Sequence, residues 1–138
     1  MRKHYPKSTI QAAALIKRKW KGCKTWSREG LLRWVQWFAD NGRLIGVFAD
    51  GKVAGVALFR FVDSVKDVRD SEYADTDGEL CYIELCVSKE KKFIRAMYPV
   101  LWNAGFSSRK FVCWARDKYS SREITVSVDQ LGRRLGYG

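Results

Sequence analysis

One charged residue interrupts an apolar stretch in the middle of the sequence. From Leu80 to Val87 nearly every residue is apolar, and Glu84 is the one charge inside this stretch. Such a run is typical of a strand that is covered on both faces. Because burial of an unpaired carboxylate is costly, we expect Glu84 either to face a cleft or to pair with a basic residue on an adjacent strand.

Three lysines follow this strand at the point where a helix should begin. Lys89, Lys91 and Lys92 lie in a turn before a helix that we expect over Phe93 to Ala104. Backbone N–H groups and the helix dipole attract anions at such a place, and lysines strengthen the attraction. This order of strand, anion-binding turn and helix predicts a site for a phosphate-bearing cofactor. The alternative is an exposed helix start with solvated lysines.

The size and composition of the chain predict one globular domain over residues 1–138. The chain has 138 residues, 46% of them hydrophobic, which disfavours disorder. No apolar run has the length of a membrane span, so we expect a soluble protein in the cytoplasm. The four cysteines lack zinc-type spacing and are expected to be reduced core residues. With His4 as its one histidine, the sequence predicts neither a metal site nor a histidine-based catalytic triad.

The net charge of +11 is unevenly distributed along the chain. Residues 1–35 hold ten Lys or Arg and one Glu, whereas residues 63–79 hold two basic and seven acidic residues. The basic ends predict attraction to polyanions or to a phosphorylated cofactor, or else a solvated basic surface. The acidic segment is expected to be a surface loop, which could recruit a cationic substrate or could simply be solvated.

The remaining elements alternate between helical and strand patterns. A first helix is expected from Ser8, with Ser8 and Gln11 forming a capping box, and a second is expected after Ser27. Asp50-Gly51 between two apolar runs predicts a hairpin of strands over 44–49 and 52–62. Pro99 should kink or shorten the helix after the lysines. A strand over 110–115 and a helix ending at Gly136 complete an α/β order, and residues 125–128 could be strand or helix.

Three segments together resemble a known family. They are the hairpin over 47–55 with its Gly55, the strand over 82–87, and the closing segment 131–137 with its Gly136-Tyr137 pair. These segments and the element order resemble the GNAT superfamily of acetyl-CoA-dependent N-acetyltransferases. The resemblance implies a single GNAT-like domain with a mixed, mostly antiparallel sheet, helices on both faces, and terminal strands that are short or missing.

The same resemblance implies a cofactor site and a reaction. Acetyl-CoA would pair its pantetheine with the backbone of Leu85, Cys86 and Val87, and the phosphates would lie near Lys89, Lys91, Lys92 and Phe93. Acetyl transfer to an amine would use Glu84 as base. Tyr137 or Tyr119 would protonate the leaving thiolate.

The sequence also departs from the family pattern. No glycine occurs between Lys89 and Arg95, where the family has a glycine-rich pyrophosphate loop. Gly132 stands where the family has a tyrosine, and the family's final strand is missing. In these respects the chain is similar to small, divergent GNAT-like proteins of bacteriophages, some of which act in the virion or on the host.

A non-catalytic role is therefore the alternative to acetyl transfer. The open sheet edge could take a protein partner or a second copy of the chain, as in a virion component. Nucleic acid could bind the basic N-terminal helix, where Trp20 and Trp26 lie among lysines. The expected location is then the host cytoplasm or the virion.

Overall fold

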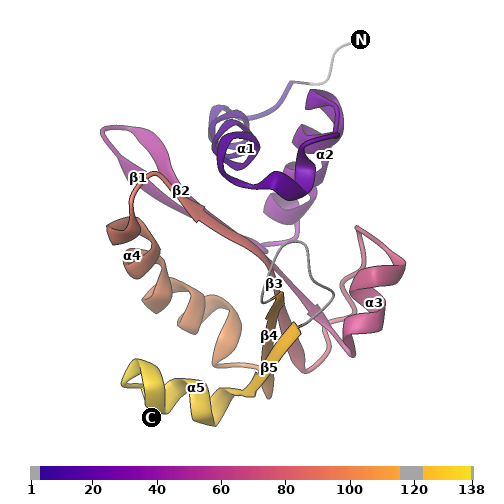
Figure 1. Cartoon of the computed structure of the whole chain (residues 1–138), viewed down its shortest axis with the longest axis vertical. Helices are drawn as coiled ribbons and strands as arrows, with labels where there is room; N and C mark the ends of the chain where they lie inside the picture. Colours follow the sequence, from indigo (N-terminus) through magenta and orange to yellow (C-terminus); the bar gives the residue numbers. More distant parts are fainter. Residues whose placement is uncertain (1–3, 116–122, 138) are drawn as a thin grey trace. The chain divides into compact units, whose positions relative to one another are not determined.

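A computed structural model describes residues 4–115 and 123–137. These residues form one mixed sheet with strand order β1-β2-β3-β4-β5, in which β1 and β5 are the outer strands (Figure 1). The β1–β2 and β4–β5 pairs are antiparallel, whereas β3 and β4 are parallel. The strands are Leu44–Ala49, Lys52–Val62, Leu80–Ser88, Phe111–Ala115 and Glu123–Ser127. The predicted α/β class with a mixed sheet is confirmed.

Five α-helices accompany the sheet within the described residues. They are α1 (Lys7–Lys19), α2 (Arg28–Asp40), α3 (Val65–Asp70), α4 (Lys91–Leu101) and α5 (Val128–Leu135). A short 3-10 helix over Lys21–Cys23 follows α1, and a π-helical turn over Trp102–Phe106 follows α4. The chain divides into two compact units, of which the first comprises Met1–Leu58 with Leu85–Met97 and the second comprises Phe59–Glu84 with Tyr98–Gly138.

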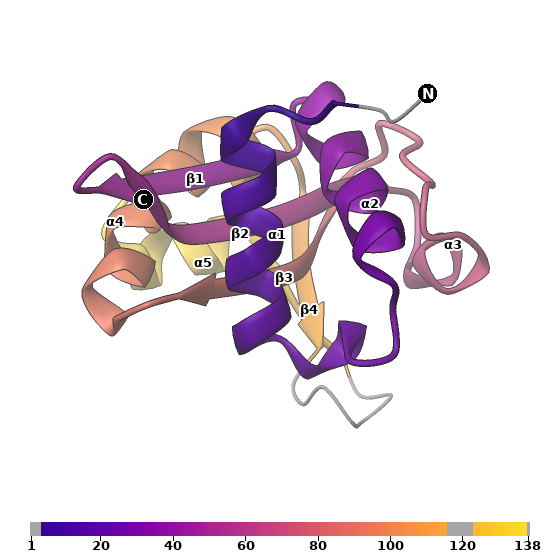
Figure 2. The same cartoon turned by 90° about the horizontal axis from the view of Figure 1, so that it is seen from above.

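The core of the first unit lies between the first two helices and the adjoining strands. Figure 2 shows α1 and α2 across β1 and β2. Fully buried side chains such as Ile16 and Val35 on these helices pack with Val56 and Leu58 on β2. Ser27 caps α2 by accepting a hydrogen bond from the amide of Gly30 at 3.0 Å, as predicted. Leu85 and Val87 of β3 belong to the same core cluster, so this packing also holds the part of β3 that leads into α4.

The hairpin between β1 and β2 forms at the predicted residues. Asp50 and Gly51 have φ angles of 54° and 75°, and a two-residue turn of type I′ requires positive φ at both positions. The register shifts between Val47 and Phe48, which marks a β-bulge in the pair. The turn chemistry therefore explains both the existence and the position of this hairpin.

Three expectations about helices were wrong in detail. The predicted capping box at Ser8 is absent, because α1 begins at Lys7 after Pro6. The side chain of Gln11 instead accepts a hydrogen bond from the amide of Val53 on β2 at 3.0 Å. The acidic segment is not entirely loop, since α3 begins within it. The helix after the lysines starts two residues earlier than expected, at Lys91, and α-helical structure continues past Pro99 to Leu101.

The capping box that the sequence does form lies at α3. Asp67 Oδ2 accepts a hydrogen bond from the amide of Ser64 at 3.1 Å. The side chain of Ser64 accepts a hydrogen bond from the amide of Asp67 in return. This reciprocal pair satisfies amides at the helix start that have no partner within the helix. It explains why a short helix of mostly polar residues forms in an acidic segment.

The second unit has a tightly packed centre around Val62. This residue packs with Leu80 and Tyr82 of β3 and with Cys113 of β4. Gly78 precedes β3, and a Cβ atom at this position would overlap the Val62 carbonyl group. A glycine is therefore needed here for close approach of two backbone segments and not for a special φ angle.

We expect Gly78→Ala to destabilise the protein by about 2–3 kcal/mol, because two backbone segments must separate to admit the methyl group. Urea unfolding curves measure this change. Gly46→Ala is the matched control, since its Cβ atom would meet nothing closer than 3.9 Å. That change should leave stability equal or slightly improved. Equal curves for Gly78→Ala and wild type would contradict the packing described for this unit.

Candidate functional site

The turn between β3 and α4 is built entirely from residues of the first unit. Leu85 and Val87 are buried in the core cluster that α1 and α2 share with β2, so their side chains hold this part of β3 in place. The amide of Lys89 donates to the carbonyl of Ala54 on β2 at 2.8 Å. Ser88 Oγ donates to the carbonyl of Glu90 at 2.7 Å, which closes the turn.

The first turn of α4 is positively charged. Lys91 is the first helical residue, and no acidic residue lies in the first turn. Lys92 forms an ion pair with Glu90 at 3.5 Å and lies 5.2 Å from the ring centre of Phe93. Lys89 and Lys91 are exposed and have no ion-pair partner in the described part of the chain. The amides of a first helical turn lack partners within the helix, so the dipole and the lysines act together on an anion.

The absence of glycine from this turn causes no backbone strain. No residue from Lys89 to Arg95 has a positive φ angle. The glycine that matters lies on the neighbouring strand, where a Cβ atom on Gly55 would be 3.3 Å from Met97 Cε and 3.4 Å from Phe93 Cβ. Gly55 therefore lets the side chains of α4 pack closely on β2.

The ladder between β3 and β4 covers only the first part of β3. Its paired residues run from Leu80 with Phe111 to Ile83 with Trp114. The strand itself continues from Glu84 to Ser88, beyond the last described pair of this ladder. Leu85, Cys86 and Val87 are thus in the part of β3 that follows the parallel ladder, and the lysines come directly after them. Burial raises the pKa of the Cys86 thiol to about 11, which keeps this side chain protonated.

Glu84 belongs to the second unit and has a basic partner on a neighbouring strand. Its Oε1 atom forms an ion pair with Nη2 of Arg60 on β2. The Glu84 side chain is 11% exposed and that of Arg60 only 2%. Burial raises the pKa of Glu84 above its ordinary value of 4.5, and the charge of Arg60 offsets part of that rise. Of the two alternatives for Glu84, the structure shows the pairing with a basic residue on an adjacent strand.

Arg60 also holds the backbone of the acidic segment. Its Nη1 atom donates to the carbonyl oxygens of Ser71 at 2.6 Å and Ala74 at 3.4 Å, and Nη2 donates to that of Val68 at 3.4 Å. One buried guanidinium thus links the end of α3 and the following loop to Glu84. Sequence reasoning missed this role, although Arg60 is the one charge within the apolar run 53–62.

Tyr137 lies elsewhere in the second unit and has different neighbours. Its ring stacks on Trp102 with centroids 5.0 Å apart and planes inclined by 15°, and 43% of the residue is exposed. Gly136 caps α5 in the left-handed conformation with φ 84°, as expected. No hydrogen bond or ring contact joins Tyr137 to Glu84 within residues 4–115 and 123–137. The other candidate, Tyr119, lies outside the described residues.

Trp102 explains the glycine at position 132. A Cβ atom on Gly132 would lie 2.7 Å from Cη2 of Trp102, so the indole ring occupies the place of a side chain. The family that the sequence resembles has a tyrosine at this position. A tyrosine side chain here would overlap the indole ring of Trp102. The departure at Gly132 is thus a packing change centred on the Trp102–Tyr137 stack.

The two tryptophans considered for nucleic-acid stacking are engaged within the first unit. Trp20 stacks on Trp34 with centroids 5.5 Å apart, and Trp26 meets Trp34 edge-on at 4.9 Å. Both are partly buried against the core. The stack on Trp34 occupies one face of the Trp20 ring, so that face is not open to a base.

The comparison with solved structures defines the fold class. No family model matches the sequence, and no curated protein matches it. Among solved structures, the chain is similar to a protein described as "GphF GNAT-like decarboxylase in complex with isobutyryl-CoA". The TM-score is 0.61 at 15% sequence identity, over 99% of this chain and 71% of that one. The fold of the chain is therefore GNAT-like, as the resemblance implied.

None of the helices in the described ranges is both long and apolar enough to cross a membrane. Within those same ranges, no three His, Cys, Asp or Glu side chains gather in a way that could hold a metal ion.

Proposed function

We propose that the chain binds acetyl-CoA along the second half of β3 and at the start of α4, and transfers the acetyl group to an amine. The observation behind this proposal is that β3 continues past its ladder with β4 at Ile83 and leads directly into the lysine-rich turn. Strand backbone beyond a ladder offers N–H and C=O groups to an extended amide chain such as pantetheine. The GNAT-like fold and the CoA ligand of the similar structure support the assignment.

The turn fits the phosphates of the cofactor on electrostatic grounds. Lys89 and Lys91 are exposed cations without ion-pair partners in the described part of the chain, and the helix dipole adds to their field. Glycine is not required, because phosphates can be held by amides of the first helical turn and by lysine point charges. Lys92 and Phe93 complete the proposed phosphate site.

Glu84 is the proposed base because it directly precedes the cofactor segment and its pKa is raised. It would accept a proton from the amine, directly or through water, while the amine nitrogen forms a bond to the thioester carbonyl carbon. The amide of Val87 or of its neighbour would donate to the oxyanion. The C–S bond then breaks, and Tyr137 would supply the proton to the thiolate. The products are an N-acetylated amine and CoA.

Replacing Lys89, Lys91 and Lys92 by Ala together should weaken acetyl-CoA binding about 100-fold. Hydrogen bonds to charged groups each contribute roughly 1.5–3 kcal/mol, so the loss of even two phosphate contacts suffices for this effect. Isothermal titration calorimetry measures the affinity of wild type and variant.

The matched control changes Arg18, Lys19 and Lys21 to Ala. These residues are also exposed, and the change in net charge is the same. Affinity within about threefold of wild type is expected for the control, because these residues belong to α1 and its connection to α2 and not to the turn proposed to hold the phosphates. No heat of binding by wild type at millimolar acetyl-CoA would refute the proposal. It would favour the alternative of a GNAT-like scaffold without catalysis, such as a virion component.

A further inference from the structure

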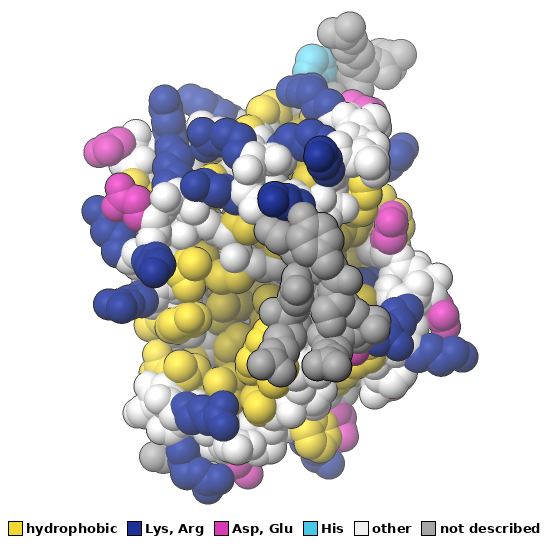
Figure 3. Space-filling model, in the orientation of Figure 1, with side chains coloured by type: hydrophobic (Ala, Val, Ile, Leu, Met, Phe, Trp, Pro, Cys, Tyr) yellow, Lys and Arg dark blue, Asp and Glu magenta, His cyan; other side chains and the backbone are white. Residues whose placement is uncertain are grey.

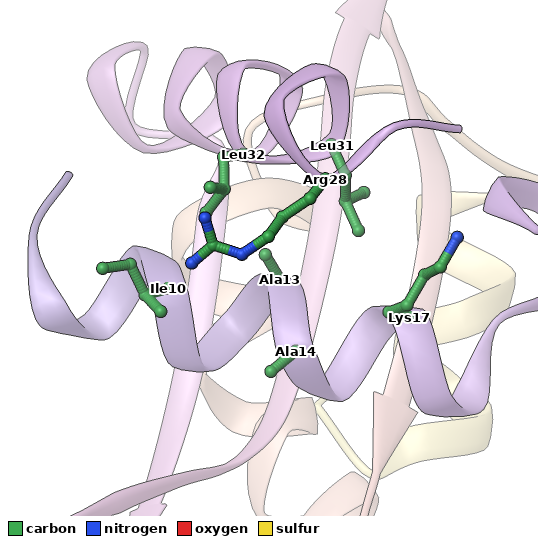
Figure 4. A pocket seen from close by; sticks show the side chains of 7 residues that line it. All are labelled: Ile10, Ala13, Ala14, Lys17, Arg28, Leu31 and Leu32. Carbon is green, nitrogen blue, oxygen red and sulfur yellow. The ribbon is translucent and has the colours of Figure 1, made fainter. Parts of the chain in front are cut away.

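A groove separates the two N-terminal helices on their outer side. We define the α1–α2 groove by seven residues, which are Ile10, Ala13, Ala14, Lys17, Arg28, Leu31 and Leu32. Its volume is about 350 Å³. Figure 4 shows the apolar side chains of both helices facing this space, with Arg28 extended between the helices. Ile10 is 38% exposed although it is a large aliphatic residue. Ala14 is exposed as well, whereas Ala13, Leu31 and Leu32 are 2–5% exposed, so Ile10 and Ala14 supply the apolar surface that the groove opens to solvent.

The two cations that line the groove, Lys17 and Arg28, differ in their hydrogen-bond partners. Lys17 Nζ donates to the carbonyl oxygens of Cys23, Lys24 and Trp26 at 3.1–3.2 Å, so it closes the connection to α2. In Figure 4 its side chain points away from the others. Arg28 has neither an ion-pair nor a hydrogen-bond partner among the residues that the structure describes. Arg28 also begins α2, at the positive end of the helix dipole, where a cation is unfavourable.

The surroundings of the groove are basic as well. Exposed cations on α1 and on its connection to α2 include Lys7, Arg18, Lys19, Lys21 and Lys24. Dark-blue side chains gather over this part of the molecule in Figure 3. The two acidic residues of α2 are engaged, since Glu29 accepts from Tyr5 at 3.0 Å and Asp40 from Gln36 at 2.7 Å. An apolar groove with an unpaired arginine in a basic field is complementary to an acidic, amphipathic ligand.

We propose that the α1–α2 groove docks an acidic amphipathic helix of a partner protein. Apolar side chains of that helix at spacings of three and four residues would enter between Ile10, Ala14 and Leu32, and its carboxylates would meet Arg28 and the surrounding lysines. This docking is independent of acetyl-CoA. Nucleic acid fits the charge but not the aliphatic groove, and the Trp20 and Trp26 rings pack on Trp34.

The probe is a fluorescein-labelled synthetic helical peptide with Leu at every third and fourth position and Glu at most others. Fluorescence anisotropy should give micromolar binding to the full chain. Arg28→Glu should weaken binding by at least about tenfold, because a close opposite charge becomes a like charge. Ala14→Gln fills the groove from an exposed helical position and should have a similar effect without loss of fold. Circular dichroism checks the fold of each variant.

The matched control is Arg33→Glu, which makes the same charge change on α2 outside the groove and should weaken binding less than about threefold. Equal losses for Arg28→Glu and Arg33→Glu would overturn the proposal, since attraction would then depend on net charge alone. Equal binding of a peptide with Ser in place of every Leu would also overturn it. So would complete displacement of the probe by an equal concentration of a single-stranded oligonucleotide of matched charge.

Discussion

Glu84→Gln should lower the rate of acetyl transfer to an amine by about 10²- to 10⁴-fold, the range that one general base contributes. The amide side chain keeps the shape of the carboxylate and can still accept a hydrogen bond from Arg60, but it cannot accept a proton. Affinity for acetyl-CoA should stay within about threefold of wild type, because the proposed cofactor contacts come from the backbone after Glu84 and from the lysines. Release of CoA thiol with a panel of amines measures the rate.

The pH dependence of this rate provides a second readout. Burial raises the pKa of Glu84 above 4.5, and only the deprotonated form can act as base. The rate should therefore rise with pH through that raised pKa, and the rise should be missing in Glu84→Gln. Glu79→Gln is the control, because this exposed carboxylate is near in sequence, lies outside the proposed cofactor segment and should leave the rate almost unchanged. A Glu84→Gln variant with wild-type rate and pH profile would exclude Glu84 as the base.

Arg60→Met should destabilise the protein by about 3–5 kcal/mol at neutral pH, because it leaves the Glu84 carboxylate buried without its counter-charge. The variant also loses the hydrogen bonds to the carbonyl oxygens of Ser71 and Ala74. Methionine has a similar length and is flexible, so the defect should be mainly electrostatic. Chemical unfolding at several pH values measures the effect.

The sign of the pH effect follows from the pKa of Glu84. Without Arg60, which lowers that pKa, it should rise further above 4.5 in the folded state. A carboxyl group whose pKa is raised in the folded state stabilises the fold at a pH below its unfolded-state pKa. This stabilisation is lost as the pH rises through the folded-state pKa. The deficit of Arg60→Met should therefore be smallest near pH 4.5 and grow toward neutral pH.

The double variant Arg60→Met/Glu84→Met separates loss of the pair from loss of one partner. Replacement of a buried ion pair by apolar residues is often neutral or stabilising, so the double variant should recover most of the loss at neutral pH. A single Arg60→Met variant within 1 kcal/mol of wild type at every pH would contradict the buried pair.

Local chemistry allowed most elements to be predicted from the sequence. The Asp50-Gly51 turn defines its hairpin by backbone preference alone, and Gly136 marks a helix end for the same reason. Ser27 marks a helix start through the hydrogen bond that its side chain accepts. The prediction of a capping box at Ser8 was wrong because Gln11 accepts a hydrogen bond from the amide of Val53 on β2, which is a tertiary contact. At α3 the capping residues Ser64 and Asp67 were visible in the sequence, but the density of charge suggested a loop.

The candidate site was predictable only where its parts are adjacent in sequence. The apolar strand, the lysines and the helix start are consecutive, so their order could be read directly. The pairing of Glu84 with Arg60 joins two strands, and nothing local identifies Arg60 as the partner. Likewise, the reason for Gly132 is the indole of Trp102, thirty positions earlier in the chain. Such contacts depend on the packing of the whole unit.

The most direct test of the proposed acetyl-CoA site is a map of amide chemical shifts. Heteronuclear NMR spectra of the ¹⁵N-labelled chain would be recorded during titration with acetyl-CoA. We predict that the largest shifts fall on the amides from Leu85 to Phe93, with small changes on α1 and α2. Unchanged spectra at millimolar acetyl-CoA, or shifts confined to α1 and α2, would contradict a cofactor site at the junction of β3 and α4.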